Sequence, residues 1–487
     1  MSRAPRIVAF LCGWCAYAAA DKAGSSHQPY PQTLLAVRVP CSGRVEPAMV
    51  LQAFREGADG VLVGGCHPGD CHHVDGNLRA AARLTLLGRA LEQASIPPER
   101  LRVEWVGAAE GPRFAEVATR MTAALEALGP LDYQRRALDS VEDVVHATRA
   151  RLHQLEAPPA APRAPGKPRV AFYWNASCGG CEEAVVDLAE DILGVVEAVD
   201  IVLWPVAMDF KKHDVEAMPD KSIVATLLNG AIRTSEQEEM AHMLRRKSQY
   251  MIAYGACAAS GGIPGLANQF SLQELLKFVY EDGPSNDNAA KTYPQTAHDD
   301  GGRRLTLPRL HEVVRTLDQV VDVDYYLPGC PPTPKLTAAA VGALLSGNLP
   351  PKGSVLAPDI ALCDECPRKA SKPTDLGFAE FQRPHQKLMD PEKCFLAQGV
   401  VCMGPATRGG CEALCVNGHM PCSGCFGGTS RVKDQGAKIL SSLAANLVAK
   451  EEKAIAAVLA GIPDPVGTFY RYGLPASLLR KKVPGGE

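Results

Sequence analysis

Short apolar runs alternate with longer amphipathic stretches through the first 130 residues. The apolar runs are bounded by Gly or Pro, as is typical of buried strands. The predicted strands are residues 7–11, 34–39, 60–63 and 101–106. The predicted helices are residues 47–56, 77–93 and 113–128. Because strands that alternate with helices usually form a parallel sheet, we expect residues 1–130 to form one α/β unit.

A second series of the same kind begins after residue 168. Its five predicted strands are separated by helix-compatible stretches, of which the first is 182–193. The strands are residues 169–174, 201–206, 222–228, 250–254 and 320–327. This order predicts an α/β domain at residues 169–350 with a flavodoxin-like, doubly wound parallel sheet. Residues 281–304 are polar and rich in Gly, Pro, Asn and Asp, so we expect a long surface loop there.

The remaining stretches differ in composition from both α/β units. Residues 131–168 begin as a charged, helix-compatible run and end in a Pro/Ala-rich run, which predicts a linker and a domain boundary. Residues 351–430 are rich in Cys and Gly and are expected to form a separate Cys-rich domain. Residues 431–487 begin with a helix-compatible run at 434–459, which Pro463 and Pro465 end, and this predicts a helical tail.

Composition narrows the class of protein. The 487 residues are 46% hydrophobic and 22% charged, as in ordinary globular domains. The net charge of −3 gives no indication of a nucleic-acid partner, and no apolar run approaches the roughly 20 residues of a membrane span. The first six residues leave no room for a signal peptide, so we expect a cytoplasmic protein. Seventeen cysteines clustered among Gly and Pro indicate metal ligation, because disulfides are rare in the cytoplasm.

Four cysteines follow three predicted strands of the second unit. Cys178 and Cys181 stand at the expected start of a helix, where free N–H groups and the helix dipole stabilise negative charge. Cys257 follows the strand at 250–254, and Cys330 follows the strand at 320–327. Ligands bind outside the carboxyl ends of parallel strands, so we expect these thiols to converge. One 4Fe–4S cluster needs four thiols.

Eight further cysteines lie within residues 361–425. They are Cys363, Cys366, Cys394, Cys402, Cys411, Cys415, Cys422 and Cys425. Eight thiols suffice for two more 4Fe–4S clusters, so that three clusters would use twelve cysteines. The surrounding glycines allow the backbone to approach a cluster closely. A zinc ribbon would also use eight cysteines, but zinc ribbons usually pair two Cys-x-x-Cys knuckles per site, and the spacings here are uneven.

Five cysteines follow three strands of the first unit. They are Cys12, Cys15, Cys41, Cys66 and Cys71. A 2Fe–2S cluster would use four of the five. A mixed Cys/His zinc site is a rival interpretation, because His67, His72 and His73 lie beside the thiols. A third interpretation is a set of isolated buried thiols, and their repeated position after strand ends argues against it.

The cysteine motifs of the second half resemble those of the [NiFe]-hydrogenase small subunit. The motifs are Ser-Cys-Gly-Gly-Cys-Glu at 177–182, Gly-Ala-Cys at 255–257 with Gly-Gly at 261–262, and Pro-Gly-Cys-Pro-Pro at 328–332. Three others are similar to the small (gamma) subunit of the cytoplasmic methyl-viologen-reducing type. They are Asp-Glu-Cys-Pro at 364–367, Cys-Met-Gly-Pro-Ala-Thr-Arg at 402–408 and Pro-Cys-Ser-Gly-Cys at 421–425.

The first unit resembles the delta subunit of the same methyl-viologen-reducing hydrogenase. The motifs are Cys-Gly-Trp-Cys at 12–15, Cys-Ser-Gly-Arg at 41–44 and Gly-Cys-His-Pro-Gly-Asp-Cys-His at 65–72. The chain therefore resembles a fusion, through the Pro-rich linker, of two subunits that are usually encoded separately. The two resemblances cover nearly the whole chain apart from the linker and parts of the loop and tail.

The resemblance implies an electron-transfer subunit of a cytoplasmic [NiFe]-hydrogenase complex that is not catalytic alone. Cys178, Cys181, Cys257 and Cys330 would hold the proximal 4Fe–4S cluster, facing the NiFe site of a separate large subunit. Cys363, Cys366, Cys394 and Cys402 would hold the distal cluster, and Cys411, Cys415, Cys422 and Cys425 the medial one. The 2Fe–2S cluster of the first unit would pass electrons to a heterodisulfide-reductase-type flavoprotein or another acceptor.

Glu182 has two interpretations of equal weight. It matches a family position near the large-subunit interface, which implies a proton relay. It is also an acid in the first turn of a predicted helix, where the dipole stabilises a carboxylate.

Two rival functions remain at this point. The cluster ligands use up almost every cysteine and leave no Cys-x-x-Cys pair for nickel, so this chain alone is not expected to split hydrogen. Small subunits of this type also resemble the quinone-reducing subunit of respiratory complex I, and some relatives serve large subunits without nickel. The second rival is a zinc-stabilised scaffold with no redox role, which would be colourless.

Overall fold

The computed structural model describes residues 3–131, 133, 166–209 and 211–480. Four parallel strands form the first sheet, in the order β2-β1-β3-β4. The strands are β1 (Ile7–Cys12), β2 (Leu34–Val39), β3 (Gly60–Gly65) and β4 (Leu101–Trp105). The helices are α1 (Ala16–Ser25), α2 (Pro47–Arg55), α3 (Gly76–Gln93) and α4 (Gly111–Leu128). The predicted α/β unit with a parallel sheet is confirmed.

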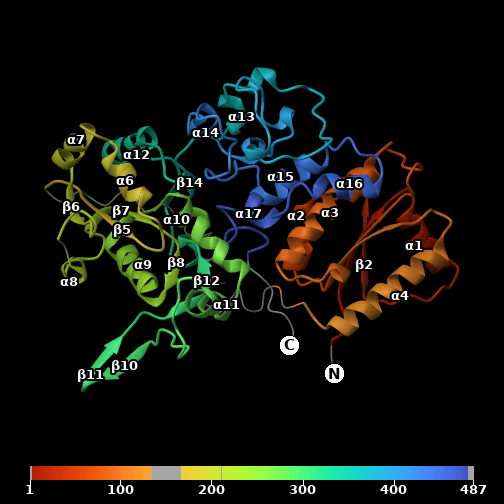
Figure 1. Ribbon diagram of the computed structural model, residues 1–487, viewed down its shortest axis with the longest axis horizontal. Helices are drawn as coiled ribbons and strands as arrows, with labels where there is room; N and C mark the ends of the chain where they lie inside the picture. The colour runs from red at the N-terminus through yellow and green to blue at the C-terminus, as the bar shows by residue number, and fades with distance from the viewer. Residues whose placement is uncertain (1–2, 132, 134–165, 210, 481–487) are drawn as a thin grey trace.

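Helices cover both faces of the first sheet (Figure 1). On one face, α1 and α4 pack against each other, and Leu11 and Phe114 belong to the core beneath them. On the other face lie α2 and α3, and Phe54 and Leu87 belong to a larger core. Helix α1 was not predicted, because seven of its ten residues are Ala, Gly or Ser and give no clear apolar stripe.

Six parallel strands form the second sheet, in the order β14-β13-β9-β7-β5-β6. The strands are β5 (Arg169–Trp174), β6 (Asp200–Leu203), β7 (Ile223–Asn229), β9 (Ser248–Tyr254), β13 (Tyr325–Leu327) and β14 (Ser354–Val355). The helices are α6 (Gly180–Val186), α7 (Asp191–Ala198), α8 (Lys212–Glu216), α9 (Ser235–Lys247), α10 (Ala256–Ser260), α11 (Leu272–Lys277) and α12 (Pro334–Ser346). The five predicted strands are confirmed as parallel neighbours, and β14 is an additional one.

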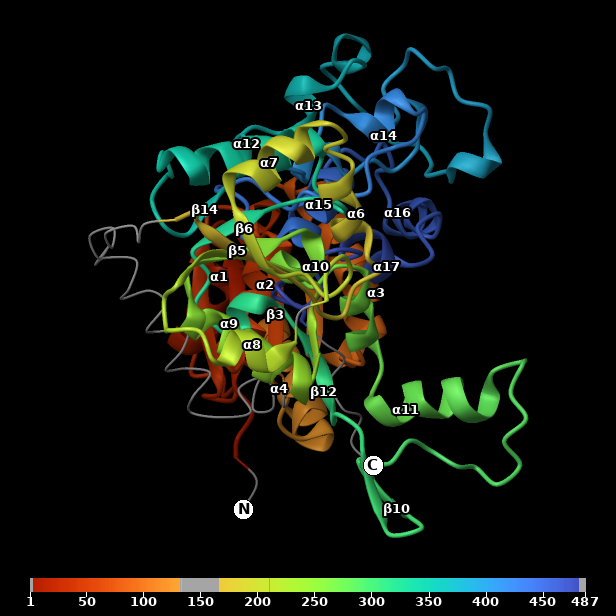
Figure 2. The same ribbon diagram turned by 90° about the vertical axis from the view of Figure 1, so that its left-hand side faces the viewer.

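Three stretches of this unit differ from the prediction. The helix predicted at 182–193 is two helices, α6 and α7, because Ala189 between them has a left-handed backbone (φ 53°). The strand predicted at 320–327 is confined to β13, because residues 320–324 form a turn and bends. The loop predicted at 281–304 includes β10 (Ala297–Asp300), which pairs with β11 (Arg303–Thr306) in a hairpin. Figure 2 shows this hairpin standing away from the body.

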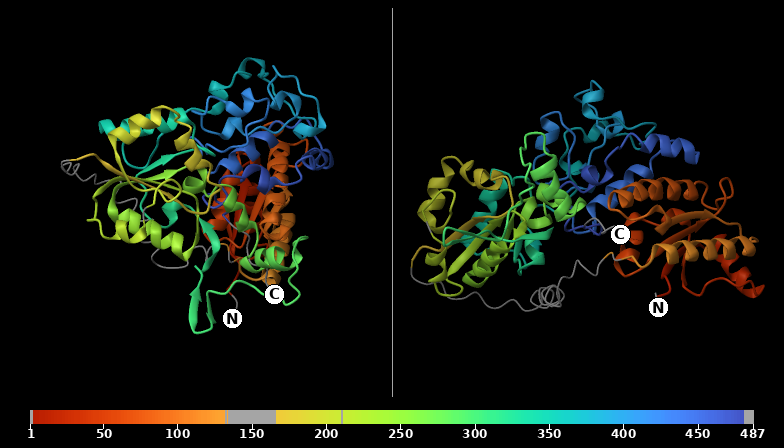
Figure 3. Two further views of the ribbon diagram at one scale, coloured as in Figure 1. Left: turned by 60° about the vertical axis from the view of Figure 1, so that its left-hand side comes forward. Right: turned by 60° about the horizontal axis from the view of Figure 1, so that its bottom comes forward.

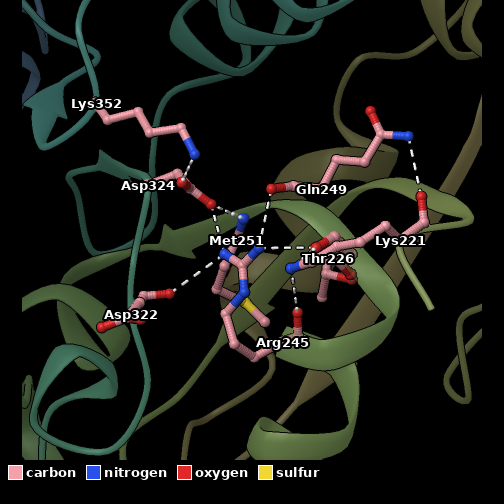
Figure 4. A network of polar contacts seen from close by, with 9 residues as sticks. Lys221, Thr226, Arg245, Gln249, Met251, Asp322, Asp324 and Lys352 are labelled. Atoms are coloured by element: carbon pink, nitrogen blue, oxygen red, sulfur yellow. Dashed lines mark hydrogen bonds and ion pairs between the residues drawn. The ribbon is translucent and has the colours of Figure 1, made fainter. Parts of the chain in front are cut away.

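A buried ionic network fixes β13 beside β9 (Figure 4). Asp324, just before β13, accepts hydrogen bonds from Arg245 Nη1 at 2.5 Å and from the Met251 backbone N–H at 2.8 Å. Lys352 Nζ lies 2.7 Å from the other carboxylate oxygen of Asp324. A short antiparallel pair, β8 (Ile232–Thr234) and β12 (Leu310–Arg315), lies outside the main sheet. The network matters for function because Cys257 follows β9 and Cys330 follows β13.

The C-terminal part contains short helices and long irregular stretches. The helices are α13 (Leu362–Glu365), α14 (Leu414–Asn417), α15 (Gln435–Ala444), α16 (Glu452–Leu459) and α17 (Pro465–Phe469). The single helix predicted at 434–459 is therefore two, α15 and α16. Leu440 and Leu459 of these helices share one core with Phe54 and Leu87 of the first unit. The last helices thus pack directly on α2 and α3 (Figure 3).

Polar contacts reinforce the packing of the tail on the first unit. Arg89 Nη1 donates to the Leu459 carbonyl, and Arg79 Nη1 donates to the Ala445 carbonyl at 2.9 Å. Tyr133, buried at the end of the first unit, donates its hydroxyl to the Leu478 carbonyl at 2.5 Å. The helix and Pro-rich linker predicted within 131–168 lie almost entirely outside the described residues. No helix among the described residues is both long and apolar enough to cross a membrane.

Candidate functional site: four cysteine groups

Four cysteines converge at the carboxyl end of the second sheet, and we call them the first group. They are Cys178, Cys181, Cys257 and Cys330. Cys181 lies in the first turn of α6 after β5, Cys257 lies in α10 after β9, and Cys330 follows β13. Burial raises the pKa of the Cys181 thiol, and the nearby thiols of the other three raise it further. Burial likewise raises the pKa of Cys257 to about 12.

Bare glycine backbone lies directly beside two of these sulfurs. A methyl group on Gly255 would overlap the Cys181 sulfur, and one on Gly262 would overlap the Cys257 sulfur. Both glycines have positive φ, 86° and 56°, which other residues rarely adopt. The two glycines therefore leave a space beside the Cys181 and Cys257 sulfurs that any side chain would occupy.

The eight cysteines of residues 361–425 separate into two further groups. Cys363, Cys366, Cys394 and Cys402 form the second group. Burial raises the pKa of Cys363 to about 12, and the thiols of the other three members add to the effect. A methyl group on Gly404 would lie 3.3 Å from the Cys363 sulfur and 3.6 Å from the Cys402 sulfur, so glycine again lines the group.

Cys411, Cys415, Cys422 and Cys425 form the third group. Burial raises the pKa of Cys425 to about 12, with further increases from the thiols of Cys415, Cys330 and Cys411. Burial also raises the pKa of Cys422, and the thiols of Cys402 and Cys425 raise it further. Two members of the third group therefore lie next to cysteines of the first and second groups.

Close approaches between cysteines arrange the three groups in a definite order. The Cys330 backbone N–H lies near the Cys425 thiol and partly offsets the effect of burial on its pKa, which places the first group beside the third. The backbone N–H of Met403, the residue after Cys402, donates to the Cys422 carbonyl at 2.9 Å, which joins the third group to the second. The spatial order is therefore first, third, second, although the order along the sequence is first, second, third.

The five cysteines of the first unit also lie together, and we call them the N-terminal group. The Cys66 sulfur is 2.6 Å from the Cys15 sulfur and 3.8 Å from the Cys12 sulfur. Burial raises the pKa of Cys41, and the neighbouring thiol of Cys71 raises it further. A methyl group on Gly76, at the start of α3, would overlap the Cys41 sulfur. All five predicted thiols are thus brought to one edge of the first sheet.

Two of the three histidines beside the N-terminal group, His67 and His72, have other partners. His67 Nε2 lies 2.7 Å from a carboxylate oxygen of Glu110, and the His72 ring stacks on Trp14 with centroids 4.2 Å apart. Within the described residues, no group of three or more Cys, His, Asp or Glu side chains is arranged to hold a single metal ion.

Asn77 is a residue of this site that the sequence analysis missed. Its amide is buried and donates to the carbonyls of Cys66 and His67, at 3.0 and 2.9 Å. It therefore fixes the loop that carries Cys66. An Asn directly after Gly76, at the start of a helix and six residues beyond Cys71, was the available signal.

Glu182 is buried beside the first group. Its carboxylate accepts hydrogen bonds from Trp204 Nε1 and from Asn229 Nδ2, the latter at 2.5 Å. Burial raises its pKa, although both hydrogen bonds act in the opposite direction. Glu182 also stands in the first turn of α6, so both interpretations of its role remain predictions. Trp204 and Asn229 carry no sequence signal of their own, because only the fold brings them to Glu182.

Comparison with known protein families matches the two α/β units separately. The delta subunit family of methyl-viologen-reducing hydrogenase matches residues 7–129. The family of the NADH ubiquinone oxidoreductase 20 kDa subunit matches residues 178–344. A solved NAD⁺-reducing [NiFe]-hydrogenase is 30% identical, covers 38% of this chain and 94% of its own, and superposes with a TM-score of only 0.33.

Individual relatives cover the chain in two parts. One iron–sulfur subunit of the F420-non-reducing hydrogenase of Archaeoglobus profundus is 39% identical over 318 residues, which are 65% of this chain and 98% of that protein. A second, shorter iron–sulfur subunit of the same organism's enzyme is 52% identical over 131 residues, which are 27% of this chain and 96% of that protein. A CoB-CoM heterodisulfide reductase subunit of Methanosarcina acetivorans is 43% identical over 146 residues, 29% of this chain and 18% of that protein.

The two Archaeoglobus relatives are hydrogenase subunits, and each is matched over nearly its whole length. The chain belongs to the F420-non-reducing hydrogenase iron–sulfur subunit family, and it joins a delta-type subunit and a small subunit in one polypeptide.

Proposed function

We propose that this chain is the iron–sulfur electron-transfer subunit of a cytoplasmic [NiFe]-hydrogenase complex. It would carry electrons from the NiFe site of a separate large subunit to an acceptor. The observation that carries the proposal is the continuous series of first, third and second cysteine groups, in which Cys330 lies beside Cys425 and Met403 N–H donates to the Cys422 carbonyl. Thiolate-ligated clusters that gain and lose single electrons are the chemistry that such a series would hold.

The proposed ligands follow the groups. The first, second and third groups would each hold one 4Fe–4S cluster, with the third in the medial position and the second in the distal one. The donor set suits this assignment, because each group offers four thiols and because Gly255, Gly262 and Gly404 leave room beside them. Four of the five thiols of the N-terminal group would hold a 2Fe–2S cluster.

The proposed acceptor of the N-terminal group is a heterodisulfide-reductase-type partner. Support comes from the segment that this chain shares with one chain of a heterodisulfide reductase. The first group would face the large subunit, because Cys178 is exposed at the edge of the second sheet. For Glu182, the hydrogen bonds from Trp204 and Asn229 favour a fixed buried carboxylate, which suits a proton relay beside that interface.

We further propose a flavodoxin-like, doubly wound classification for residues 169–350. The order β6-β5-β7-β9-β13 supports it, since this is the 2-1-3-4-5 order of that fold. The proposed domain limits are 1–130, 131–168, 169–350, 351–430 for a Cys-rich domain with two clusters, and 431–487 for the helical tail.

A second candidate is a related complex whose large subunit lacks nickel. The match of residues 178–344 to the NADH ubiquinone oxidoreductase 20 kDa subunit family favours it. In this case the same cluster series would carry electrons, but hydrogen would not be their source.

The two candidates are separated by exposing the anaerobically purified complex to hydrogen gas. Under the first proposal, the co-purifying large chain contains nickel, and hydrogen bleaches the visible cluster absorption. Replacing Cys178 by Ser should abolish that bleaching without removing nickel. Bleaching by dithionite alone, with no nickel in the large chain, would favour the second candidate.

A further inference from the structure

A buried cation packs against the segment that carries Cys394 of the second cysteine group. The Arg368 side chain belongs to a residue that is only 5% exposed, two positions after Cys366. Its Nη1 donates to the Lys393 carbonyl at 3.1 Å, and its guanidinium carbon lies 4.1 Å from the centre of the Phe395 ring. Cys394 stands between those two contact residues in the sequence, so the guanidinium lies against the segment that carries Cys394.

The same guanidinium reaches the third group. Arg368 Nη2 lies 3.1 Å from His419 Nδ1, which must accept because a guanidinium only donates. His419 lies between Cys415 and Cys422 in the sequence, and its backbone has a left-handed φ of 59°. Arg368 therefore bridges the loops that carry the second and third groups.

Arg368 has no acidic partner among the residues that the structure describes. The other buried arginine nearby, Arg408, lies 2.8 Å from a carboxylate oxygen of Asp359. In the second unit, Arg245 is likewise paired with Asp324. A buried charge is costly unless an opposite charge compensates it. At Arg368 the contacts are two neutral acceptors and an aromatic ring, so the counter-charge must come from another source.

The geometry points to Arg368 as a residue that raises the reduction potential of the cluster held by the second group. The inference rests on the proposed function, in which thiolate ligands give that cluster a net negative charge. One added electron makes the cluster more negative. A fixed cation in a poorly screened interior stabilises that extra charge, so Arg368 would raise the potential. Arg368 would act through its positive charge and is not a ligand of the cluster.

The test is an EPR-monitored redox titration of the full-length chain in its complex, purified without oxygen. Arg368→Gln removes the charge and keeps a donor for the Lys393 carbonyl, whereas Arg368→Lys keeps the charge. Lys369→Gln is the matched control, because Lys369 is the next residue, is 59% exposed and is already paired with Asp364 at 2.9 Å. Iron per chain is measured on every variant.

We expect Arg368→Gln to keep the iron content and to lower the midpoint potential of one cluster signal. Arg368→Lys should retain most of the wild-type potential, and Lys369→Gln should retain all of it. A full iron content with unchanged potentials in Arg368→Gln would overturn the inference. Equal iron loss in the Gln and Lys variants would also overturn it, because Arg368 would then be purely structural. Wild-type protein without iron would instead refute the proposed function itself.

Discussion

The backbone N–H of Cys330 lies near the thiol of Cys425 and partly offsets the effect of burial on the pKa of that thiol, so that two cysteines 95 positions apart belong to adjoining groups. Cys330 follows β13 of the second sheet, and Cys425 lies in the irregular C-terminal part. A peptide N–H near a cluster ligand is one of the ways in which a protein adjusts cluster potentials. The contact also makes the third group the connection between the first and the second.

Removing one ligand from the third group should interrupt the series in the middle. For Cys425→Ser we expect a loss of about four irons per chain, the content of one cubane. Electrons supplied at the first group should then no longer reach the second. Freeze-quench EPR after mixing with hydrogen measures this transfer. Cys394→Ser, at the end of the series, is the comparison: the first and third groups should still be reduced. Normal reduction of the second group in Cys425→Ser would contradict the proposed order.

A methyl group at Gly255 should prevent the first group from forming. Gly255 has φ 86° and ψ 165°, a conformation largely restricted to glycine, and the added carbon would overlap the Cys181 sulfur. We therefore expect Gly255→Ala to lose about four irons. Gly347→Ala is the control: its φ is 72° but no atom lies within 4 Å, so it should cost about 1 kcal/mol and no iron. Equal iron contents in the two variants would show that the first group does not need the space beside Gly255.

Loss of the Asp324 carboxylate should destabilise the strands that carry Cys257 and Cys330. Asp324→Asn leaves the largely buried Arg245 with carbonyl acceptors but no opposite charge, which should cost about 3 kcal/mol. Lys352→Met removes the more exposed partner and should cost about 1 kcal/mol. Urea unfolding followed by circular dichroism compares the midpoints. An Asp324→Asn midpoint equal to that of the wild type would show that the network contributes nothing.

The contribution of Asp324 should depend on pH. Burial by itself raises the pKa of Asp324, but Arg245, Lys352 and the Met251 N–H outweigh burial, and the pKa falls below its usual value. A lowered carboxyl pKa stabilises the folded state above the unfolded pKa of about 4, and this stabilisation is lost as pH falls through the folded-state value. The difference between the wild type and Asp324→Asn should therefore shrink in acid below about pH 4. A difference that grows in acid would contradict this sign.

The tail, and not only the covalent linker, should hold the two units together. Leu440 and Leu459 share a core with α2 and α3. The Tyr133 hydroxyl donates a hydrogen bond to the Leu478 carbonyl. We expect that a chain with a protease site inserted between residues 134 and 165 stays one particle after cleavage, as judged by size-exclusion chromatography. With Leu440→Asp, which buries a charge in that core, the cleaved halves should separate. Separation of the cleaved wild-type halves would contradict the packing.

Most strands could be predicted from the sequence because each is a short apolar run with Gly or Pro at its ends. The same reasoning placed the cysteines after strand ends, and the parallel sheets then bring the thiols of the first and N-terminal groups together. The prediction of one helix at 182–193 was wrong because the chain breaks at Ala189. The left-handed backbone of Ala189 has no signal in the amino-acid composition.

Contacts between distant segments were not predictable from one sequence. Neither the apolar stripe of α15 nor that of α3 says that the two helices share a core. In the same way, Arg368 and Trp204 have no distinctive sequence surroundings and gain their positions only from the fold. The order of the second and third groups in space, which reverses their order along the chain, was implied only by the family resemblance and not by the spacing of the cysteines.

The central claim is that one chain holds four iron–sulfur clusters, and its most direct test is the iron and acid-labile sulfide content of protein purified without oxygen. The account predicts about 14 irons per chain, the sum of three 4Fe–4S clusters and one 2Fe–2S cluster, with an equal amount of sulfide. A colourless protein that contains zinc in place of iron would contradict it.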